Sequence, residues 1–445
     1  MRSNICRAER EGERWCQWGM WIRSKHTSIA VVLVLTSCGA SAATSSDASS
    51  PAPIHPTAPP TANAEMPFAT DSIPESQAAF PSRLALTRRD GHVLTFSRGQ
   101  NPIDTPGVMG PSGDVVVSSD TLAGVSTVEW HRVSTDEISA SINVDGKLRP
   151  TAISEDGKVV ALIGTAGHTT TVVLATPSGG EVRRWTFDAV LVPEAFANAF
   201  EEGSQLPIGV FVIEYLDTNT YRVRVINTAT GELGLPLNLR DKSQTVDEVM
   251  TAVSRTAVFD PNNQLLFTLY QDASEGGENV GSFIHTLGLV NGVWCLDVPV
   301  SLGLADNPGA LAVTPDGSRL FAASSIGGVA GYEVSDITSF GPEMPRARVT
   351  TAIGTAAPHV AIAANKDQVL VALGSSLFRL DPATLEVRDA FTWDMDVEAV
   401  TLLDDGSAVI VGTGRMTLVS PDDKLVAERV LPASASEITR VAVLD

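Results

Sequence analysis

The stretch Pro308-Gly-Ala-Leu-Ala-Val-Thr-Pro-Asp-Gly-Ser-Arg-Leu-Phe321 decides the fold of this chain. It places two short apolar segments on either side of a polar turn, Thr314-Pro-Asp-Gly317. An Asp-Gly pair favours a tight hairpin, because glycine adopts positive φ without steric cost and aspartate tolerates it. The stretch therefore predicts two antiparallel strands joined by a tight turn.

The same pattern recurs along the rest of the chain. The other copies span Pro106–Val117, Ala152–Val160, Ala257–Leu266, Val360–Leu370 and Ala399–Val409. A second hairpin follows the first ones, as in Leu377–Val387 and Met416–Val426. Four strands in a unit of roughly 40–50 residues are typical of β-propeller blades. The sequence thus predicts an all-β protein, a β-propeller of four-stranded blades.

Two turn motifs carry a resemblance to a known family. Thr314–Phe321 and Ile226-Asn-Thr-Ala-Thr-Gly-Glu232 resemble the repeats of YVTN-type, lactonase-like β-propellers. The resemblance covers about 350 residues, and what it implies for them is their architecture as repeated blades. The motifs themselves are turn chemistry and imply no activity, although the family would permit a lactonase-like hydrolase of small sugar derivatives.

Counting the units gives seven complete blades and two remaining pieces. Arg83–Phe96 resembles an outer hairpin, and Ile438–Leu444 resembles an innermost strand. The two pieces either supplement a ring of seven blades or together form an eighth, split blade. We favour seven blades, because that number is commoner in the families that this chain resembles. In both cases the chain ends meet and close the ring, which protects its edge strands.

The N-terminal region predicts export and lipidation. Basic residues precede the apolar run Ile29–Leu35, which is only about a third of the ~20 residues that a membrane-spanning helix needs. Leu35-Thr-Ser-Cys38 resembles a bacterial lipobox, so residues 1–37 are interpreted as a signal peptide, with Met20 as a candidate true start. Lipid on Cys38 would anchor the protein to a membrane of the bacterial cell envelope, with the chain facing outside the cytoplasm.

The following segment separates the anchor from the folded domain. Residues 38–82 consist mostly of Ala, Ser, Thr and Pro, a composition that cannot bury enough apolar surface to fold and that proline extends. We interpret it as a disordered spacer, and residues 83–445 as the propeller. With Cys38 lipidated, Cys295 is the remaining cysteine after the signal peptide, so no internal disulfide is expected.

Net charge excludes one class of partner. The chain has a formal net charge of −21, and its basic residues do not cluster. Nucleic acids are bound by clustered cations that release counterions. Nucleic acid is therefore not an expected partner.

Propeller topology sorts the polar residues onto two faces. The turns inside hairpins face one side, and Asp156, Asp260, Asp316 and Asp405 are expected to serve only those turns. The opposite side is expected to carry the long insertions. One is Pro193–Gly203, a predicted helix that begins with proline and ends with glycine.

The candidate ligand-binding residues lie in loops of that second side. They are His168, Asp272, Glu275, Glu278 and His359. A separate run, Asp394-Met-Asp-Val-Glu398, has three carboxylates at alternate positions. Extended backbone would point Asp394, Asp396 and Glu398 to one side, as a Ca²⁺ site requires. No other cofactor is predicted.

Function is predicted only as a class. The sequence contains no nucleophile elbow, zinc-binding helix motif, phosphate loop or EF-hand loop, and no catalytic residue is assigned. The favoured hypothesis is a binding module for a protein or small-molecule ligand. The alternatives are the lactonase-like hydrolase and a structural subunit of an envelope complex.

Overall fold

A computed structural model describes most of the chain from Phe80 onward. The described residues are 80–98, 101–135, 137–199, 206–218, 220–238, 243–247, 249–251, 254–271, 282–290, 293–297, 308–339, 346–354, 356–432, 435 and 437–444. The signal peptide, Met20, Cys38 and nearly all of the spacer lie outside them, so these predictions stay predictions. None of the helices in the described ranges is long and apolar enough to cross a membrane.

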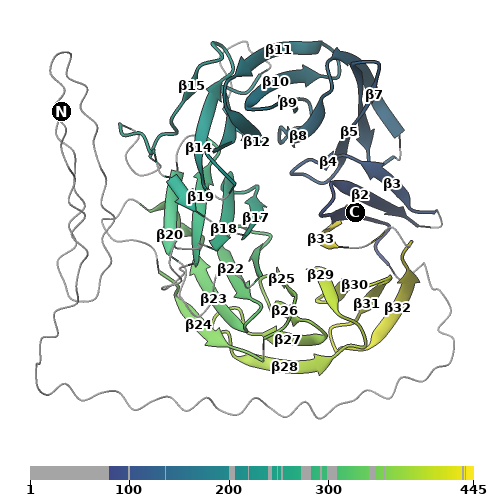
Figure 1. The fold of residues 1–445 in the computed structure, drawn as a ribbon. Coiled ribbons are helices and arrows are strands. Elements are labelled where there is room, and N and C mark those ends of the chain that lie inside the picture. The colour runs from purple at the N-terminus through teal and green to yellow at the C-terminus, as the bar shows by residue number, and fades with distance from the viewer. Residues whose placement is uncertain are drawn as a thin grey trace, which may run out of the picture. The chain divides into compact units, whose positions relative to one another are not determined.

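The described strands form eight antiparallel sheets that follow one another around a ring (Figure 1). We number these sheets as blades 1 to 8 and give their strands from the inside outward. Blade 1 is β33 (Ile438–Val443), β1 (Arg83–Arg88), β2 (His92–Ser97) and β3 (Ile103–Pro106). Blade 2 is β4 (Val108–Met109), β5 (Val115–Leu122), β6 (Val125–Arg132) and β7 (Glu137–Asp145). Blade 3 is β8 (Arg149–Ile153), β9 (Val160–Ala166), β10 (Thr169–Thr176) and β11 (Gly180–Phe187).

The middle of the chain forms the next three blades. Blade 4 is β12 (Val190–Phe196), β13 (Gly209–Tyr215) and β14 (Thr220–Asn227), with β15 (Leu233–Gly234) and β16 (Val249–Thr251) sharing its outer position. Blade 5 is β17 (Ser254–Asp260), β18 (Leu265–Gln271), β19 (Ser282–Gly288) and β20 (Val293–Asp297). Blade 6 is β21 (Gly309–Val313), β22 (Arg319–Ser324), β23 (Gly328–Glu333) and β24 (Val349–Ala352), with α1 (Val334–Thr338) between the last two.

The last two complete blades are regular. Blade 7 is β25 (Val360–Ala364), β26 (Val369–Leu373), β27 (Ser376–Leu380) and β28 (Val387–Thr392). Blade 8 is β29 (Val397–Leu402), β30 (Ala408–Gly412), β31 (Arg415–Val419) and β32 (Leu425–Val430). Together with blade 1, this confirms the all-β propeller.

The blade count corrects the preference for seven. Seven blades are continuous in sequence, and the two remaining pieces form an eighth, because β33 pairs antiparallel with β1. Leu84 pairs with Val443 and Leu86 with Val441 in that ladder. The split closing blade, which the sequence offered as the alternative, is therefore the one that forms.

Aspartates hold the turns between the first and second strands, as expected. Asp316 Oδ1 accepts hydrogen bonds from the Thr314 hydroxyl at 2.6 Å and from the Ser318 amide at 3.0 Å. Gly317 beside it has φ of 68°, a conformation that side-chain-bearing residues rarely adopt. These bonds lower the pKa of Asp316, chiefly through Thr314, so the carboxylate stays charged in the turn.

The core lies between neighbouring blades. In the fully buried β26, Leu370 and Ala372 pack in a cluster with blade 8, whereas Val369 and Val371 pack in a cluster with blade 6. Alternate side chains of a strand point to opposite faces of its sheet. A strand that is apolar at every position is thus explained by a blade with a neighbour on both sides.

The predicted helix at Pro193–Gly203 is wrong where the structure describes it. Pro193 to Phe196 belong to β12, in which Pro193 pairs with Val212 and Phe196 with Val210. The register shifts next to Pro193, and an inner edge strand with a bulge tolerates the missing amide of proline. The connection after β12 joins first and second strands, so it also lies on the side of the hairpin turns and not on the side expected.

Candidate functional site

The two sides of the ring differ in what they carry. We call the side with the turns between first and second and between third and fourth strands the hairpin face. The side with the turns between second and third strands and with the connections from blade to blade is the connection face. The candidate residues Asp272, Glu275 and Glu278 fall between β18 and β19, a second-to-third connection, and lie outside the described residues.

A hollow of about 320 Å³ opens on the connection face at blade 7. Three segments build it: the connection from blade 6, the turn between β26 and β27, and the connection to blade 8. Its walls are formed by Gly354, Ala356, Ala357, Pro358, Leu373, Gly374, Ser375, Ser376, Phe378 and Asp396. It combines an aromatic side and small apolar groups with two hydroxyls and one carboxylate.

Backbone hydrogen bonds fix the walls of this hollow. The Gly374 amide donates to the His359 carbonyl at 3.1 Å, and the Val397 amide donates to the Gly374 carbonyl at 3.0 Å. The turn therefore joins the incoming and the outgoing connection of blade 7. Gly374 has φ of 56°, so a side chain there would strain the turn that holds the walls.

Asp396 is the charged group of the hollow. Its side chain is exposed, and it has no ion-pair or hydrogen-bond partner among the described residues. A carboxylate in this state keeps its capacity to accept hydrogen bonds from a cation or an amide. The residues present can therefore receive a positively charged group beside an aromatic wall.

The three alternating carboxylates do not lie on one extended strand. Residues 394 and 395 form a bend, and the register of β29 shifts between Val397 and Ala399, at Glu398. Asp394 pairs with Arg415, while Glu398 Oε2 accepts a hydrogen bond from the Ile438 amide at 2.8 Å. The expectation of an extended backbone is wrong here, because the bend and the bulge re-aim the side chains.

Calcium binding by this run stays a prediction. Within the described ranges, no group of three or more His, Cys, Asp or Glu side chains is arranged to hold a metal ion. Two of the three carboxylates already accept hydrogen bonds from protein groups. A cation at Asp396 would have to draw its other ligands from hydroxyls, carbonyls or water.

The two candidate histidines are both exposed and lie on the connection face. His168 lies in the turn between β9 and β10 of blade 3, and His359 directly precedes β25 of blade 7. The ring therefore separates them. The His359 carbonyl accepts a hydrogen bond from the amide of Gly374, a wall residue, but His359 itself does not line the hollow.

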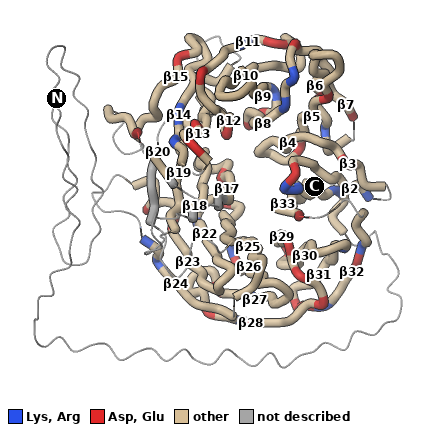
Figure 2. Tube along the Cα trace, viewed as in Figure 1, with Lys and Arg blue, Asp and Glu red and all other residues tan. Residues whose placement is uncertain are grey.

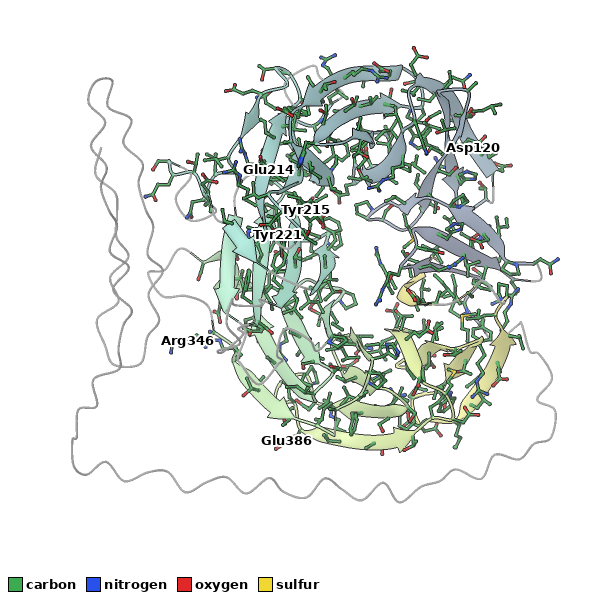
Figure 3. All side chains as sticks on the ribbon, in the orientation of Figure 1. Asp120, Glu214, Tyr215, Tyr221, Arg346 and Glu386 are labelled. Atoms are coloured by element: carbon green, nitrogen blue, oxygen red, sulfur yellow. The ribbon has the colours of Figure 1, made fainter. Side chains whose placement is uncertain are left out.

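A second polar cluster lies on blade 4, where Figure 3 shows Glu214 and Tyr215 on β13 close to Tyr221 on β14. Glu214 Oε2 accepts hydrogen bonds from Arg222 at 2.6 Å and from Arg224 at 3.0 Å. Burial alone would raise the pKa of Glu214, but the two guanidinium groups outweigh it and lower that pKa. With the charge of Glu214 paired to Arg222 and Arg224, this cluster joins β13 to β14.

Charge is spread over the ring and does not mark a site by itself (Figure 2). A buried ion pair joins blades 7 and 8, where Arg379 Nε donates to Asp423 Oδ1 at 2.6 Å. Burial raises the pKa of Asp423 to about 6, although Arg379 acts to lower it. Arg379 also donates to Gln368 and to the Ser420 carbonyl, so the pair serves packing between blades.

The sequence analysis missed the hollow itself. Most of its residues are small, and they come from three separate segments of the chain, 354–358, 373–378 and 396. The one local signal is Gly374-Ser-Ser376, a turn with positive φ and two hydroxyls. Such a turn is indistinguishable from an ordinary hairpin turn until the neighbouring connections are placed beside it.

Comparison with known proteins describes the fold. No family model and no curated protein matches the sequence. The chain is similar in structure to BamB from Moraxella catarrhalis, with a TM-score of 0.46, 14% identity and coverage of 73% of this chain and 87% of that one. Sqt1 from Saccharomyces cerevisiae gives a TM-score of 0.46, 10% identity and coverage of 73% and 84%.

A third similar structure is Hsv2 from Kluyvelomyces marxianus, with a TM-score of 0.42, 11% identity and coverage of 73% and 98%. At these identities, the likeness concerns the fold alone. With the sheet order described above, the chain is an eight-bladed β-propeller.

Proposed function

We propose that this protein is a binding module that takes a protein partner on its connection face, with the hollow at blade 7 receiving a lysine or arginine side chain. One observation carries the proposal: Asp396 is an exposed carboxylate without a described partner, placed at the wall of a hollow of about 320 Å³. The size is at the lower end of ligand pockets, which span roughly 300–1,000 Å³.

The chemistry of the walls supports a cationic side chain as the group bound. Phe378 offers an aromatic surface for the aliphatic part and the charge, and Ser375 and Ser376 offer hydroxyl oxygens. The net charge of −21 would speed the approach of a basic partner surface. A rim of fixed backbone lowers the entropy cost of ordering the site on binding.

The location of the module is part of the proposal. Lipid on Cys38 would anchor the chain to a membrane of the bacterial envelope, and the Pro-rich spacer would carry the propeller away from the surface. The resemblance of the turn motifs to YVTN-type repeats is consistent with a scaffold that presents loops. It leaves the hydrolase hypothesis without an assigned residue.

Charge reversal on the two faces tests the proposal. We would use the tagged full chain, its Asp396→Lys variant and its Asp404→Lys variant to capture partners from native envelopes. Asp404 is an exposed carboxylate on the hairpin face of the neighbouring blade 8, so it matches the charge change without touching the hollow. We expect a stoichiometric protein with the wild type and Asp404→Lys, and at least a tenfold loss with Asp396→Lys.

Two outcomes would contradict the proposal. A partner retained equally by both variants would place the interface elsewhere. The absence of any partner with the wild type, followed by stabilisation of the wild type by a small molecule in thermal-shift screening, would favour the small-molecule hypothesis.

A further inference from the structure

The outer strand of blade 2 differs from every other outer strand that the structure describes. β7 has nine residues, Glu137-Ile-Ser-Ala-Ser-Ile-Asn-Val-Asp145, and its interior has no charge and no proline. Each other outer strand has five residues or fewer, or has a charged residue in its interior, as with Arg184 in β11, Asp389 in β28 and Glu428 in β32.

An uncharged edge of this length is an unusual feature. The outer edge of a sheet presents unpaired amides and carbonyls to any other strand, and proteins commonly block it with charge, proline, brevity or a β-bulge. β7 has one bulge, at Ser139 near its start, and its register against β6 is regular from Ala140 to Asp145. In the described sheets, β7 pairs with β6 on one side and with no strand on the other. Ile138 is 54% exposed there, so the edge also presents an apolar side chain to solvent.

The two faces of β7 have different surroundings. Ala140, Ile142 and Val144 belong to the apolar cluster between blades 2 and 3, which includes Trp130 and Leu148. Ser141 and Asn143 are exposed on the opposite face, and Ser139 lies in the bulge, where its hydroxyl donates to the Trp130 carbonyl at 3.1 Å. A strand added to the edge would continue both faces, so its side chains would alternate between apolar residues towards blade 3 and polar residues towards solvent.

Charge at the two ends of β7 decides what can pair with it. Antiparallel pairing of β7 with a second copy centred on Ser141 would place Glu137 opposite Asp145 twice, and like charges directly opposite destabilise a ladder. Residues 39–82 of the same chain contain no lysine or arginine, so they offer no cation to the acidic ends of β7. Lysine or arginine at the ends of an added strand would instead meet the acidic ends of β7, where Arg184 already donates to the Asp145 carbonyl at 2.8 Å.

We propose that β7 is a docking edge for an extended segment of a partner protein, with alternating apolar and polar residues flanked by basic ones. The segment adds to blade 2 as a further antiparallel strand. Main-chain hydrogen bonds supply affinity, and the basic flanks set its position against Glu137 and Asp145. This site is separate from the hollow at blade 7.

The test uses peptides and a substitution that places a charged side chain on the edge strand β7. A phage library of nine-residue peptides, with lysine at both ends and random residues between, would be selected on the full chain. Recovered peptides would be labelled and measured by fluorescence anisotropy. We expect alternating sequences that bind the wild type and bind Ser141→Lys at least tenfold more weakly, because a lysine on the edge repels the basic flanks and obstructs pairing.

Matched controls separate edge pairing from other binding. Val426→Lys places lysine on β32, the outer strand of blade 8, where Val426 is 41% exposed, and it should leave binding unchanged. Peptides methylated on alternate backbone nitrogens should lose binding. Hydrogen exchange of the amides of residues 139–144 should slow when peptide binds.

Three results would overturn the proposal. The first is that the selection enriches no peptide. The second is that the enriched peptides bind the wild type and a folded Ser141→Lys variant with equal affinity, and the third is that hydrogen exchange in β7 does not change at saturating peptide. Sedimentation showing a wild-type dimer that Ser141→Lys dissociates would assign the edge to a second copy instead.

Discussion

His285 shows how a single buried group sets a pH dependence. It lies in β19, is 3% exposed, and its Nε2 has no hydrogen-bond partner among the described residues. A void of about 10 Å³ beside it is lined by Glu194, Thr268 and Tyr270 among others. Burial lowers the pKa of His285 to about 4, because the charged form loses its hydration.

The sign of the effect follows from proton uptake. The unfolded chain binds a proton at this histidine near pH 6.5, while the folded protein does so only near pH 4. The unfolded state therefore holds more protons between these values, and the free energy of unfolding falls as pH drops through that window. From pH 7.5 to pH 5 we expect His285 to account for a loss of about 2 kcal/mol.

Urea unfolding of the wild type and His285→Leu at both pH values measures this. Leucine fills a similar volume in a site lined by Phe211, Ile213 and Leu287, and it does not titrate. All other groups titrate alike in both proteins, so the variant should lose about 2 kcal/mol less than the wild type over this range. Equal losses in the two proteins would show that His285 is not protected from protonation.

Residues whose role is local were predictable from sequence, and residues whose role depends on distant neighbours were not. Asp316 acts within its own turn, so Asp-Gly spacing was enough to assign it. Asp394 and Glu398 have partners in β31 and β33, which the sequence places 21 and 40 residues away. Their alternation predicts a shared site, and their side-chain partners lie on two different strands.

At the scale of elements, β33 closes the ring, and Glu398 holds its start. Glu398 lies in the bulge of β29, and its carboxylate accepts a hydrogen bond from the Ile438 amide at 2.8 Å. Glu398→Ala would leave that amide without its acceptor, at a cost of about 1–3 kcal/mol in unfolding free energy. Glu398→Gln keeps an acceptor oxygen and should cost less.

Hydrogen exchange locates the effect. In Glu398→Ala, amides of β1 that pair with β33, such as those near Leu84 and Leu86, should exchange faster than amides of β10 in the distant blade 3. Uniformly faster exchange in both strands would indicate a general loss of stability. Unchanged exchange in both strands would show that Glu398 does not stabilise the closure of the ring.

Strand positions were predicted more reliably than the connections between them. Alternating or continuous apolar runs next to Asp-Gly turns identify strands such as β22 and β26, because each strand must bury its side chains against neighbouring blades. The segment after Pro193 has helical end signals, but pairing with β13 overrides them. Local signals at the ends of an element are weak when an adjacent strand offers a full ladder of hydrogen bonds.

At the scale of the whole domain, ring closure converts a repeat into two different faces. Eight blades place their hairpin turns on one side and their connections on the other. The sequence could not decide between seven and eight blades, because the two remaining pieces have the same pattern whether or not they pair. Pairing of β1 with β33 settles the count and brings residues 352 positions apart into one sheet, as in the hydrogen bond from the Thr439 hydroxyl to the Thr87 carbonyl.

The central claim is that a protein partner contacts the connection face at blade 7, and photo-crosslinking tests it most directly. A benzophenone amino acid at Ala356, an exposed wall residue of the hollow, would be compared in native envelopes with one at Lys158, exposed on the hairpin face. We predict a discrete protein adduct from position 356 that disappears when Asp396→Lys is added, and none from position 158. Adducts of equal yield from both positions, or one at position 356 that persists with Asp396→Lys, would contradict the claim.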